Sequence, residues 1–339
     1  MMTIKEAIQK TVEGISLSQE EAHLVAGEIM EGRATDAQIA ALLMALRLKG
    51  ETIDEITGFA KTMREKATRI PCAAENIVDT CGTGGDGSGT FNISTLSAIV
   101  AAGAGCPVAK HGNRSVSSQC GSADVLKALG VNLEISPEKA GACIDQNDIG
   151  FLFAPLLHKA MKYAIGPRRE LGVRTIFNIL GPLTNPAGAK RQLMGVFSGD
   201  LTEPLANALK NLGSEHVMVV HGEDGLDEMT LNGKTRVSEL KEGQVTTYDL
   251  NPAALGVKTA AANDLKGGDV EQNAAIAKAV LSGEKSAKRD TVVINAGAVI
   301  YVGGKAPSIE AGMQQAEEAI DSGAAMEKLR MLVKLTNEG

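Results

Sequence analysis

Residues 79–95 constrain this chain more than any other segment, because five glycines fall between positions 82 and 89. A short apolar run, Ile77 and Val78, precedes them, and a helix-like run begins near Asn92. A strand, a glycine-rich turn and a helix start form an arrangement in which backbone N–H groups and the helix dipole converge on an anion. The sequence therefore predicts a phosphate-binding loop within an α/β fold.

Two familiar phosphate motifs fit this loop poorly. Gly82, Gly84 and Gly87 match G-x-G-x-x-G, but a dinucleotide site also needs an acidic residue at the end of the next strand. The next predicted strand, 107–109, ends instead in Lys110-His111, and a cation there suits another phosphate. No Lys-Ser/Thr pair follows the glycines, which argues against a P-loop. The alternative, a tight surface loop, leaves the surrounding polar residues unexplained: Asp86, Thr90, Asn92, Ser94 and Thr95.

Composition narrows the class of protein. At 339 residues, with 44% apolar and 22% charged residues, the chain has ordinary globular composition and room for about two domains. A net charge of −7 and an aromatic content of 3% argue against a nucleic-acid partner. No apolar stretch approaches membrane-spanning length, and the five scattered cysteines form no C-x-x-C pair. We therefore expect a cytoplasmic enzyme with reduced thiols and no membrane partner.

The first 70 residues are predicted to be helical. Amphipathic runs there begin with capping-box patterns, which are Thr3-x-x-Glu6, Ser18-x-x-Glu21, Thr35-x-x-Gln38 and Thr52-x-x-Glu55. A second helical, strand-poor segment spans about 157–182. We expect it to pack with the N-terminal helices, so that residues 1–70, completed by about 157–182, form a small all-helical domain.

The remaining residues, 71–156 and 183–339, alternate short apolar runs with alanine- and glycine-rich helical stretches. Strands are expected near 77–80, 107–109, 131–134, 150–153, 193–197, 216–220 and 291–295. Asn232-Gly233 reads as a hairpin turn. This alternation predicts a large α/β domain with a mainly parallel central sheet, which carries the phosphate-binding loops.

A second polar loop follows the predicted strand 107–109. Lys110 can act as a point charge on phosphate, and the neighbouring serine and asparagine side chains supply neutral donors. Because the carboxyl ends of parallel strands meet at one edge of a sheet, we expect this loop to share a site with the glycine loop. The alternative is a solvated basic loop. The predicted loop comprises Lys110, His111, Gly112, Asn113, Arg114, Ser115, Val116, Ser117 and Ser118.

Two further motifs carry charge. Asp227 and Glu228 follow the predicted strand 216–220, and Mg²⁺ prefers one or two carboxylates together with substrate phosphate oxygens. The alternative is a solvated acidic loop. Arg168, in Gly166-Pro167-Arg168-Arg169, could reach from the helical domain to a substrate carboxylate, although a surface arginine is the commoner outcome. No nucleophile–base pair stands out, so positioning and electrostatics are the expected means of catalysis.

Taken in chain order, these motifs resemble the anthranilate phosphoribosyltransferases. The resemblance rests on GTGGD at 82–86, NIST at 92–95, KHGNRSVSS at 110–118, GSADVL at 121–126, GPRR at 166–169 and the late DE pair. It implies the fold type of the nucleoside phosphorylases and related phosphoribosyltransferases. It also implies transfer of phosphoribose from phosphoribosyl pyrophosphate (PRPP) to the amine of anthranilate, in tryptophan biosynthesis.

The resemblance also implies roles for individual residues. The catalytic residues would be Lys110, Asn113 and Arg168. Anthranilate would contact Gly82, His111, Asn113 and Arg168, and Mg²⁺ would be held by Ser94, Asp227 and Glu228. PRPP would be bound by Gly82, Gly85, Asp86, Thr90, Asn92, Ile93, Ser94, Thr95, Lys110, His111, Gly112, Asn113, Arg114, Ser115, Val116, Ser117, Ser118 and Ser122.

The resemblance further implies a homodimer that forms through the small helical domain. Some relatives carry a fused glutamine amidotransferase domain, so any such partner, an anthranilate synthase subunit, would here be a separate chain. Two alternatives stay open. A pyrimidine nucleoside phosphorylase shares the architecture, but its lysine loop lacks the HGN sequence at 111–113. A non-catalytic nucleic-acid-binding relative should carry excess basic residues, which the net charge of −7 opposes.

Overall fold

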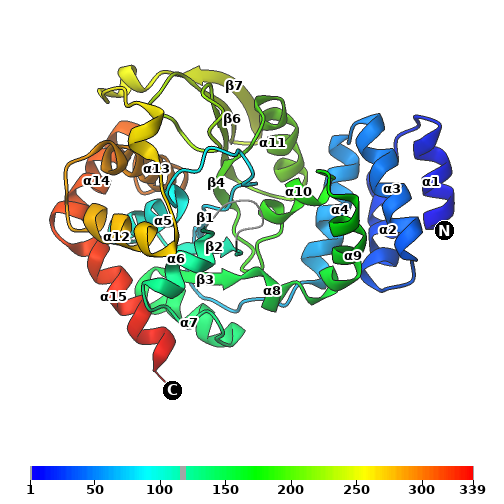
Figure 1. Ribbon diagram of the computed structural model, residues 1–339, viewed down its shortest axis with the longest axis horizontal. Coiled ribbons are helices and arrows are strands. Elements are labelled where there is room, and N and C mark those ends of the chain that lie inside the picture. Colours follow the sequence, from blue (N-terminus) through cyan, green and yellow to red (C-terminus); the bar gives the residue numbers. More distant parts are fainter. Residues whose placement is uncertain (1, 115–119, 339) are drawn as a thin grey trace.

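The computed structural model describes residues 2–114 and 120–338, and these form two lobes (Figure 1). The smaller lobe holds the N-terminal helices, and the larger holds the sheet and the C-terminal helices. The N-terminal helices are α1 (Ile4–Val12), α2 (Gln19–Met30), α3 (Asp36–Lys49) and α4 (Ile53–Lys66). Each begins with the capping box that the sequence predicts, the N-cap hydroxyl accepting from the N3 backbone N–H.

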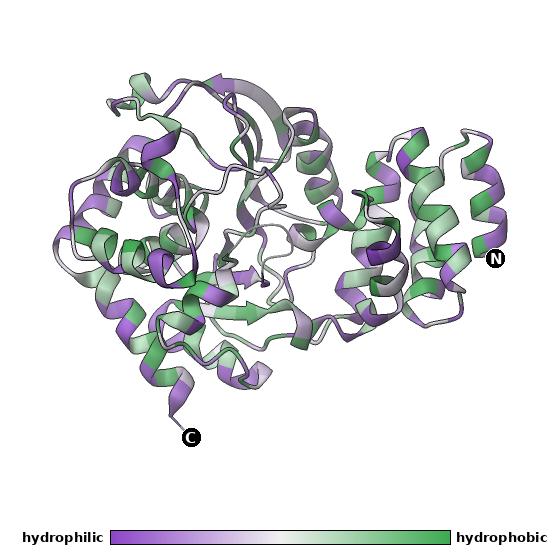
Figure 2. Cartoon of the chain, in the orientation of Figure 1, coloured by the Kyte–Doolittle hydropathy of each residue, from purple (hydrophilic) through white to green (hydrophobic). Residues whose placement is uncertain are grey.

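The helical lobe includes a segment from later in the chain. Helix α9 (Lys162–Leu171) packs against α2 and α3, and α10 (Phe177–Leu180) packs against α4. Ala164, Phe177 and Leu180 are buried in one core with Leu42 and Phe59. Figure 2 shows hydrophobic and hydrophilic residues alternating along these helices, as amphipathic packing requires.

A seven-stranded sheet forms the centre of the larger lobe, in the order β3-β2-β1-β4-β5-β6-β7. Every pairing from β3 to β5 is parallel, and β6 and β7 add an antiparallel edge. The expected fold class, a small helical domain with a mainly parallel α/β domain, is confirmed. The strands are β1 (Val78–Asp79), β2 (Val108–Gly112), β3 (Ile149–Phe153), β4 (Arg191–Gly195), β5 (His216–Gly222), β6 (Thr235–Lys241) and β7 (Gln244–Leu250).

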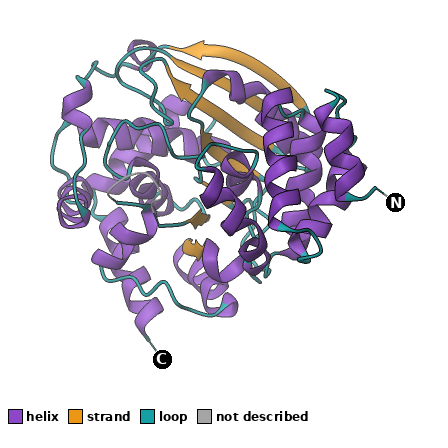
Figure 3. Cartoon of the chain, turned by 45° about the vertical axis from the view of Figure 1, so that its right-hand side comes forward, coloured by secondary structure: helices purple, strands orange, loops and turns teal. Residues whose placement is uncertain are grey.

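Helices enclose the sheet on both faces (Figure 3). Along β5, Met218 and Val220 belong to the core on one face, whereas Val217 and Val219 belong to the core on the other. The first core is covered by α5 (Ile93–Gly103), α13 (Ala287–Val302), α14 (Ile309–Asp321) and α15 (Ala324–Asn337). The second is shared by α11 (Thr202–Asn211) and the helical lobe. The remaining helices are α6 (Ser122–Ala128), α7 (Pro137–Asn147), α8 (Ala154–Leu157) and α12 (Val270–Leu281).

Three sequence expectations are wrong. Residues 291–295 lie inside α13, where burial on all sides hides the helical period that would distinguish a helix from a buried strand. Residues 131–134 link α6 to α7 without regular structure. The hairpin joins β6 to β7 through Glu242-Gly243, and not through Asn232-Gly233. Both residues of the observed turn have positive φ, 51° and 75°, which suits the twist of a two-residue hairpin.

Candidate active site

The glycine loop leaves the sheet at the end of β1 and enters α5, with Asn92 at the helix N-cap position. Gly84, Gly85, Gly87 and Gly89 have φ values between 64° and 79°, which side chains adopt only with strain. Gly82 is required for a different reason, because a Cβ there would lie 2.8 Å from the Gly195 carbonyl oxygen. The loop therefore needs its glycines both for its own conformation and for its fit against β4.

Two cations hold this loop from outside. Arg174 Nη2 donates to the Gly85 carbonyl at 2.5 Å, and Lys266 Nζ donates to the Ser88 carbonyl at 2.6 Å. Because a trans peptide places C=O and N–H on opposite sides, the next N–H groups, of Asp86 and Gly89, point away from these cations. Sequence reasoning missed both residues, since no motif marks them and they lie far from the loop in sequence.

Lys110 is buried in the middle of β2, with 3% of its surface exposed, because the strand extends through Gly112 and so includes the first three residues of the predicted loop. Its Nζ donates to Thr80 Oγ1 at 3.0 Å and to Ser94 Oγ at 3.1 Å. Burial lowers the pKa of Lys110, while Asp79 and Glu228 oppose that shift. The lysine predicted from sequence is thus aimed at the glycine loop and the start of α5, and the solvated-loop alternative does not hold for it.

The acidic pair lies beside the same loop. Glu228 Oε1 accepts from the Ser94 backbone N–H at 3.1 Å, and the Asp227 N–H donates to Asp86 Oδ2 at 3.4 Å. Gly195 permits this approach, since a Cβ there would collide with the Asp227 carbonyl oxygen. The end of β4 therefore fixes the backbone that carries the two carboxylates.

Burial and repulsion between charges raise the pKa values of Asp227 and Glu228. Burial, followed by the charge of Asp86, raises the pKa of Asp227 to about 7. Burial and the charge of Asp227 raise the pKa of Glu228 well above its usual range. Grouped carboxylates that disfavour their own ionisation form an environment that a divalent cation stabilises, and oxygen donors are those that Mg²⁺ prefers. The residues present therefore fit a magnesium ion.

Arg168 lies on α9, half-buried, with its guanidinium carbon 5.2 Å from the centroid of the Phe177 ring. Burial lowers its pKa. Within the described residues it forms no ion pair, whereas its neighbour Arg169 is exposed. A planar cation held against a ring and lacking a carboxylate partner is suited to an anionic substrate group.

His111 is buried on β2, with its ring centroid 5.0 Å from that of His158. Burial, followed by the charge of His158, lowers the pKa of His111 to about 3, although the Gly181 backbone opposes this. Neither ring nitrogen of His111 has a well-formed hydrogen bond to a described residue. The imidazole is therefore neutral near pH 7.

The other predicted residues lie on the segments that carry this group or next to them. Asn113 is exposed, and its carbonyl accepts from Ser122 Oγ at 3.2 Å. Gly112 leaves room for the Phe151 ring, 2.5 Å from where a Cβ would stand. Asn92 Nδ2 donates to the Cys120 carbonyl at 3.2 Å. The rest lie on the glycine loop, on α5 or just after β2, and they are Thr90, Ile93, Thr95 and Arg114.

Two of the predicted site residues form no hydrogen bond with this group. Among the described residues, Arg168 and Asn113 form no hydrogen bond to Lys110, Asp227 or Glu228. Ser115, Val116, Ser117 and Ser118 lie outside the described residues. The described helices include none that is both long and apolar enough to cross a membrane.

Comparison with known proteins gives two family matches. Residues 5–67 match the helical bundle domain of a glycosyl transferase family, and residues 74–326 match the a/b domain of a glycosyl transferase family. Among curated proteins, anthranilate phosphoribosyltransferase of Acetivibrio thermocellus is 56% identical over 334 residues, covering 98% of this chain and 97% of that protein.

Solved structures give the same relatives. The anthranilate phosphoribosyltransferase of Thermus thermophilus matches with a TM-score of 0.93 and 46% identity, covering 98% of this chain and 99% of that one. The Saccharomyces cerevisiae enzyme in complex with PRPP and Mg matches with a TM-score of 0.88 and 28% identity, covering 98% and 97%. The yeast enzyme with 4-fluoroanthranilate gives a TM-score of 0.88 at 26% identity, with coverage of 98% and 97%.

Proposed function

This chain belongs to the anthranilate phosphoribosyltransferases, and we propose that the residues at the carboxyl edge of its sheet carry the reaction. The enzyme transfers the phosphoribosyl group of PRPP to the amine of anthranilate. The products are N-(5-phosphoribosyl)anthranilate and pyrophosphate, and the step belongs to tryptophan biosynthesis. The observation that carries the assignment is a glycine loop bordered by a buried lysine and an acidic pair.

PRPP binds along the glycine loop and the loop after β2. The backbone N–H groups of the first loop face the phosphates, and the N-terminus of α5 adds its dipole. Lys110, held by Thr80 and Ser94, supplies a fixed positive charge. The yeast relative has been solved with PRPP and Mg, which supports this assignment.

Mg²⁺ is held by Asp227, Glu228 and Ser94 together with oxygens of the substrate. When bound, the ion neutralises charge on the pyrophosphate leaving group. The acidic cluster supports this, because Asp86 opposes the ionisation of Asp227, and both of these carboxylates oppose the ionisation of Glu228. The yeast structures with Mg are consistent with this choice of metal.

Catalysis rests on orientation and charge. As pyrophosphate leaves the C1′ carbon, positive charge grows on the ribose ring, as in glycoside cleavage. Lys110 stabilises the departing group, and its fixed hydrogen bonds avoid a cost of reorganisation during the reaction. The aromatic amine is already neutral, so attack needs no strong base. Correct placement of the amine beside C1′ then supplies much of the rate.

Anthranilate is placed between the helical lobe and the sheet edge. Arg168 binds its carboxylate through a planar guanidinium that no described carboxylate occupies. Asn113, Gly82 and His111 line the approach. Because burial keeps His111 neutral, that ring offers no positive charge that would compete with Arg168 for the carboxylate.

Steady-state kinetics of Arg168→Ala test this function. We expect anthranilate use to weaken by about 1.5–3 kcal/mol, the range for a hydrogen bond to a charged group, with little change in KM for PRPP. Aniline, which lacks the carboxylate, should be a poor acceptor for wild type and no worse for the variant. Arg169→Ala, at the exposed neighbouring position, is the matched control. A loss of PRPP saturation with unchanged anthranilate saturation would reassign Arg168 to phosphate.

A homodimer that forms through the helical lobe is also part of this proposal. Val12 and Leu48 are 71% and 82% exposed, although both are large and apolar. They stand at the C-terminal ends of α1 and α3, two helices that pack on each other, and Lys49 Nζ donates to Ser16 Oγ at 3.3 Å. A second copy of this chain would cover them. An association with an amidotransferase or anthranilate synthase partner is a further part of this proposal. Neither a nucleoside phosphorylase nor a nucleic-acid-binding relative is favoured.

A further inference from the structure

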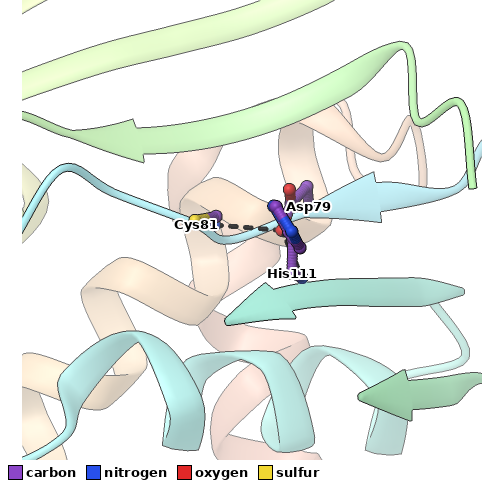
Figure 4. Close-up of side chains that lie close together, drawn as sticks. All are labelled: Asp79, Cys81 and His111. Atoms are coloured by element: carbon purple, nitrogen blue, oxygen red, sulfur yellow. Dashed lines mark hydrogen bonds between the residues drawn. The ribbon is translucent and has the colours of Figure 1, made fainter. Parts of the chain in front are cut away.

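Three potential metal ligands lie together beside the proposed substrate site. Asp79 ends β1, Cys81 follows two residues later, and His111 lies on β2 (Figure 4). A carboxylate oxygen, the thiol sulfur and an imidazole nitrogen all lie within 4.8 Å of one another. Because β1 and β2 are parallel neighbours, the sheet itself holds these groups at one edge.

Two of the three side chains have buried polar atoms with no well-formed hydrogen bond to a described residue. Asp79 is 1% exposed and His111 is 3% exposed. Asp79 Oδ1 accepts from the backbone N–H groups of Cys81 and His111 at 3.0 and 3.1 Å, which fixes the carboxylate and leaves Oδ2 without a well-formed hydrogen bond. The two ring nitrogens of His111 likewise have no well-formed hydrogen bond to a described residue. Asn185 and the Gly181 backbone act on Asp79 and His111 respectively, so these side chains are not isolated, but each keeps a buried polar atom that a cation could bind.

We propose that Asp79, Cys81 and His111 form a site for one thiophilic divalent cation of the Zn²⁺ class, separate from the magnesium site. A sulfur, a nitrogen and an oxygen donor are the set that Zn²⁺ accepts, with a fourth position left for water or substrate. Mg²⁺ prefers oxygen ligands throughout, so the two sites select different ions. A thiolate and a carboxylate would together cancel the ion's charge within a buried site.

Binding requires one proton to move. The Cys81 S–H bond breaks as the sulfur–metal bond forms, and the proton passes to solvent. Burial raises the pKa of the Cys81 thiol, and the charges of Asp79, Asp227 and Glu228 raise it further, so the thiol keeps its proton until a cation binds. His111 is already neutral and has a lone pair to give. Lys110, which acts electrostatically on Cys81, favours the thiolate but opposes the cation.

An ion here would also stop turnover, a consequence that rests on the proposed function. Cys81 directly precedes Gly82 of the glycine loop, and His111 directly follows Lys110. A metal bound to both would tie the loop to β2 and withdraw His111 from the approach to anthranilate. Inhibition by Zn²⁺ should therefore persist when Mg²⁺ is saturating.

Cobalt absorption tests the site without any reliance on activity. Co²⁺ added to the full chain in excess Mg²⁺ should give the sulfur-to-cobalt charge-transfer band and the visible bands of a four-coordinate ion. Zn²⁺ should displace Co²⁺ at one equivalent per chain. Cys81→Ser should abolish the charge-transfer band and weaken Zn²⁺ binding more than about tenfold, the lower end of what losing even a second-shell partner costs. Cys81→Ala gives a second variant if the serine form is unstable.

Cys72→Ser is the matched control, since Cys72 is a half-buried thiol outside this group. It should leave the Co²⁺ band and Zn²⁺ binding unchanged. The proposal is overturned if wild type gives no thiolate band, or if Cys72→Ser loses the band while Cys81→Ser keeps it. Zn²⁺ that binds at one equivalent without slowing turnover would refute the inhibitory role. Failure of the reaction itself would leave the cobalt result intact, so the two hypotheses can be separated.

Discussion

Gly195 has no reactive side chain, but its backbone determines where residues with reactive side chains lie. The end of β4 touches the glycine loop on one side, where the Thr83 N–H donates to the Gly195 carbonyl at 2.9 Å. On the other side it touches the backbone of Asp227, so closely that no Cβ could be accommodated. The glycine loop and the acidic pair are thus both positioned by the backbone of Gly195.

Neutralising the acidic pair should separate activity from stability. Asp227→Asn with Glu228→Gln should lower turnover at least about 100-fold, a typical loss when electrostatic stabilisation is removed. Because burial and repulsion disfavour ionisation of both groups in the folded state, Mg²⁺-free variant protein at pH 8 should melt at a higher temperature than wild type. Kinetics and thermal unfolding check both effects, with exposed Glu223→Gln as control. Full activity at limiting Mg²⁺ would remove this pair from the metal site.

Stability in acid should depend on His158. Burial lowers its pKa to about 4, against an unfolded value of about 6.5. Between these values the unfolded chain binds the extra proton, so the stability contributed by neutral His158 is lost as pH falls below about 6.5. From pH 8 to pH 5, wild type should lose about 2 kcal/mol relative to His158→Gln. Urea unfolding of both proteins at each pH measures this difference in the free energy of unfolding. The contribution of Asp227 and Glu228 cancels, because both proteins contain that pair. Parallel pH curves would contradict it.

As an element, the glycine loop is held in place by its neighbours. Four of its glycines have positive φ values, and Arg174 and Lys266 bind its carbonyls from outside. Arg174 also stacks 4.0 Å from the centroid of the Phe197 ring, which limits its movement. The two cations thereby determine which way the loop's N–H groups face.

Removing Arg174 should therefore affect PRPP selectively. Arg174→Ala should raise KM for PRPP about tenfold, which corresponds to about 1.4 kcal/mol, because the Gly85–Asp86 peptide loses its fixed orientation. The KM for anthranilate should change little. Initial-rate kinetics with each substrate varied in turn will show whether the KM for PRPP changes while the KM for anthranilate does not. Arg169→Ala is again the control. Equal changes in both KM values would indicate a general loss of structure.

The elements differ in how far sequence could predict them. All four N-terminal capping boxes formed as predicted, because a cap depends on residues three apart. The run at 291–295 is part of a helix and not the expected strand, because α13 is buried all round and its sequence lacks a polar face. Lys110, Ser94 and Glu228 were identified by motif, whereas Arg174 and Lys266 act through long-range contacts that leave no local pattern. How the site residues divide the chemistry remains a prediction, as do the domain boundaries.

At the scale of the whole molecule, the two lobes share a core. Buried residues of the helical lobe, α11 and one face of β4 and β5 form a continuous cluster. Among the described residues, the large apolar side chains that stay exposed lie in the two helical segments, at 12, 15, 48, 163, 165 and 173, except for Leu156, which lies just before the second of these segments. The surface of the helical lobe is therefore where another copy of the chain would bind.

A charge in this surface should separate the copies. Leu48→Asp should move the protein from dimer toward monomer, because a carboxylate would be buried without a partner. Sedimentation velocity over a range of concentrations will measure the change. Thr246→Asp, on exposed β7 of the other lobe, should leave the dimer intact. Wild-type protein that sediments as a monomer at every concentration would end the dimer proposal.

Strand β1 is two residues long, and this affects how the two halves of the sheet are held together. Its neighbours β2 and β4 continue past its last residue, and side chains replace the missing strand there. Asp79 accepts from the His111 N–H, Asn185 donates to the Ala109 carbonyl, and Gln192 donates to the Cys81 carbonyl. The sheet is thus two ribbons, β3–β2 and β4–β7, joined by a short seam. Fewer backbone pairs cross that seam than cross the junction of β2 with β3 or of β4 with β5, so we expect the sheet to part there first on partial unfolding, beside Lys110 and the start of the glycine loop.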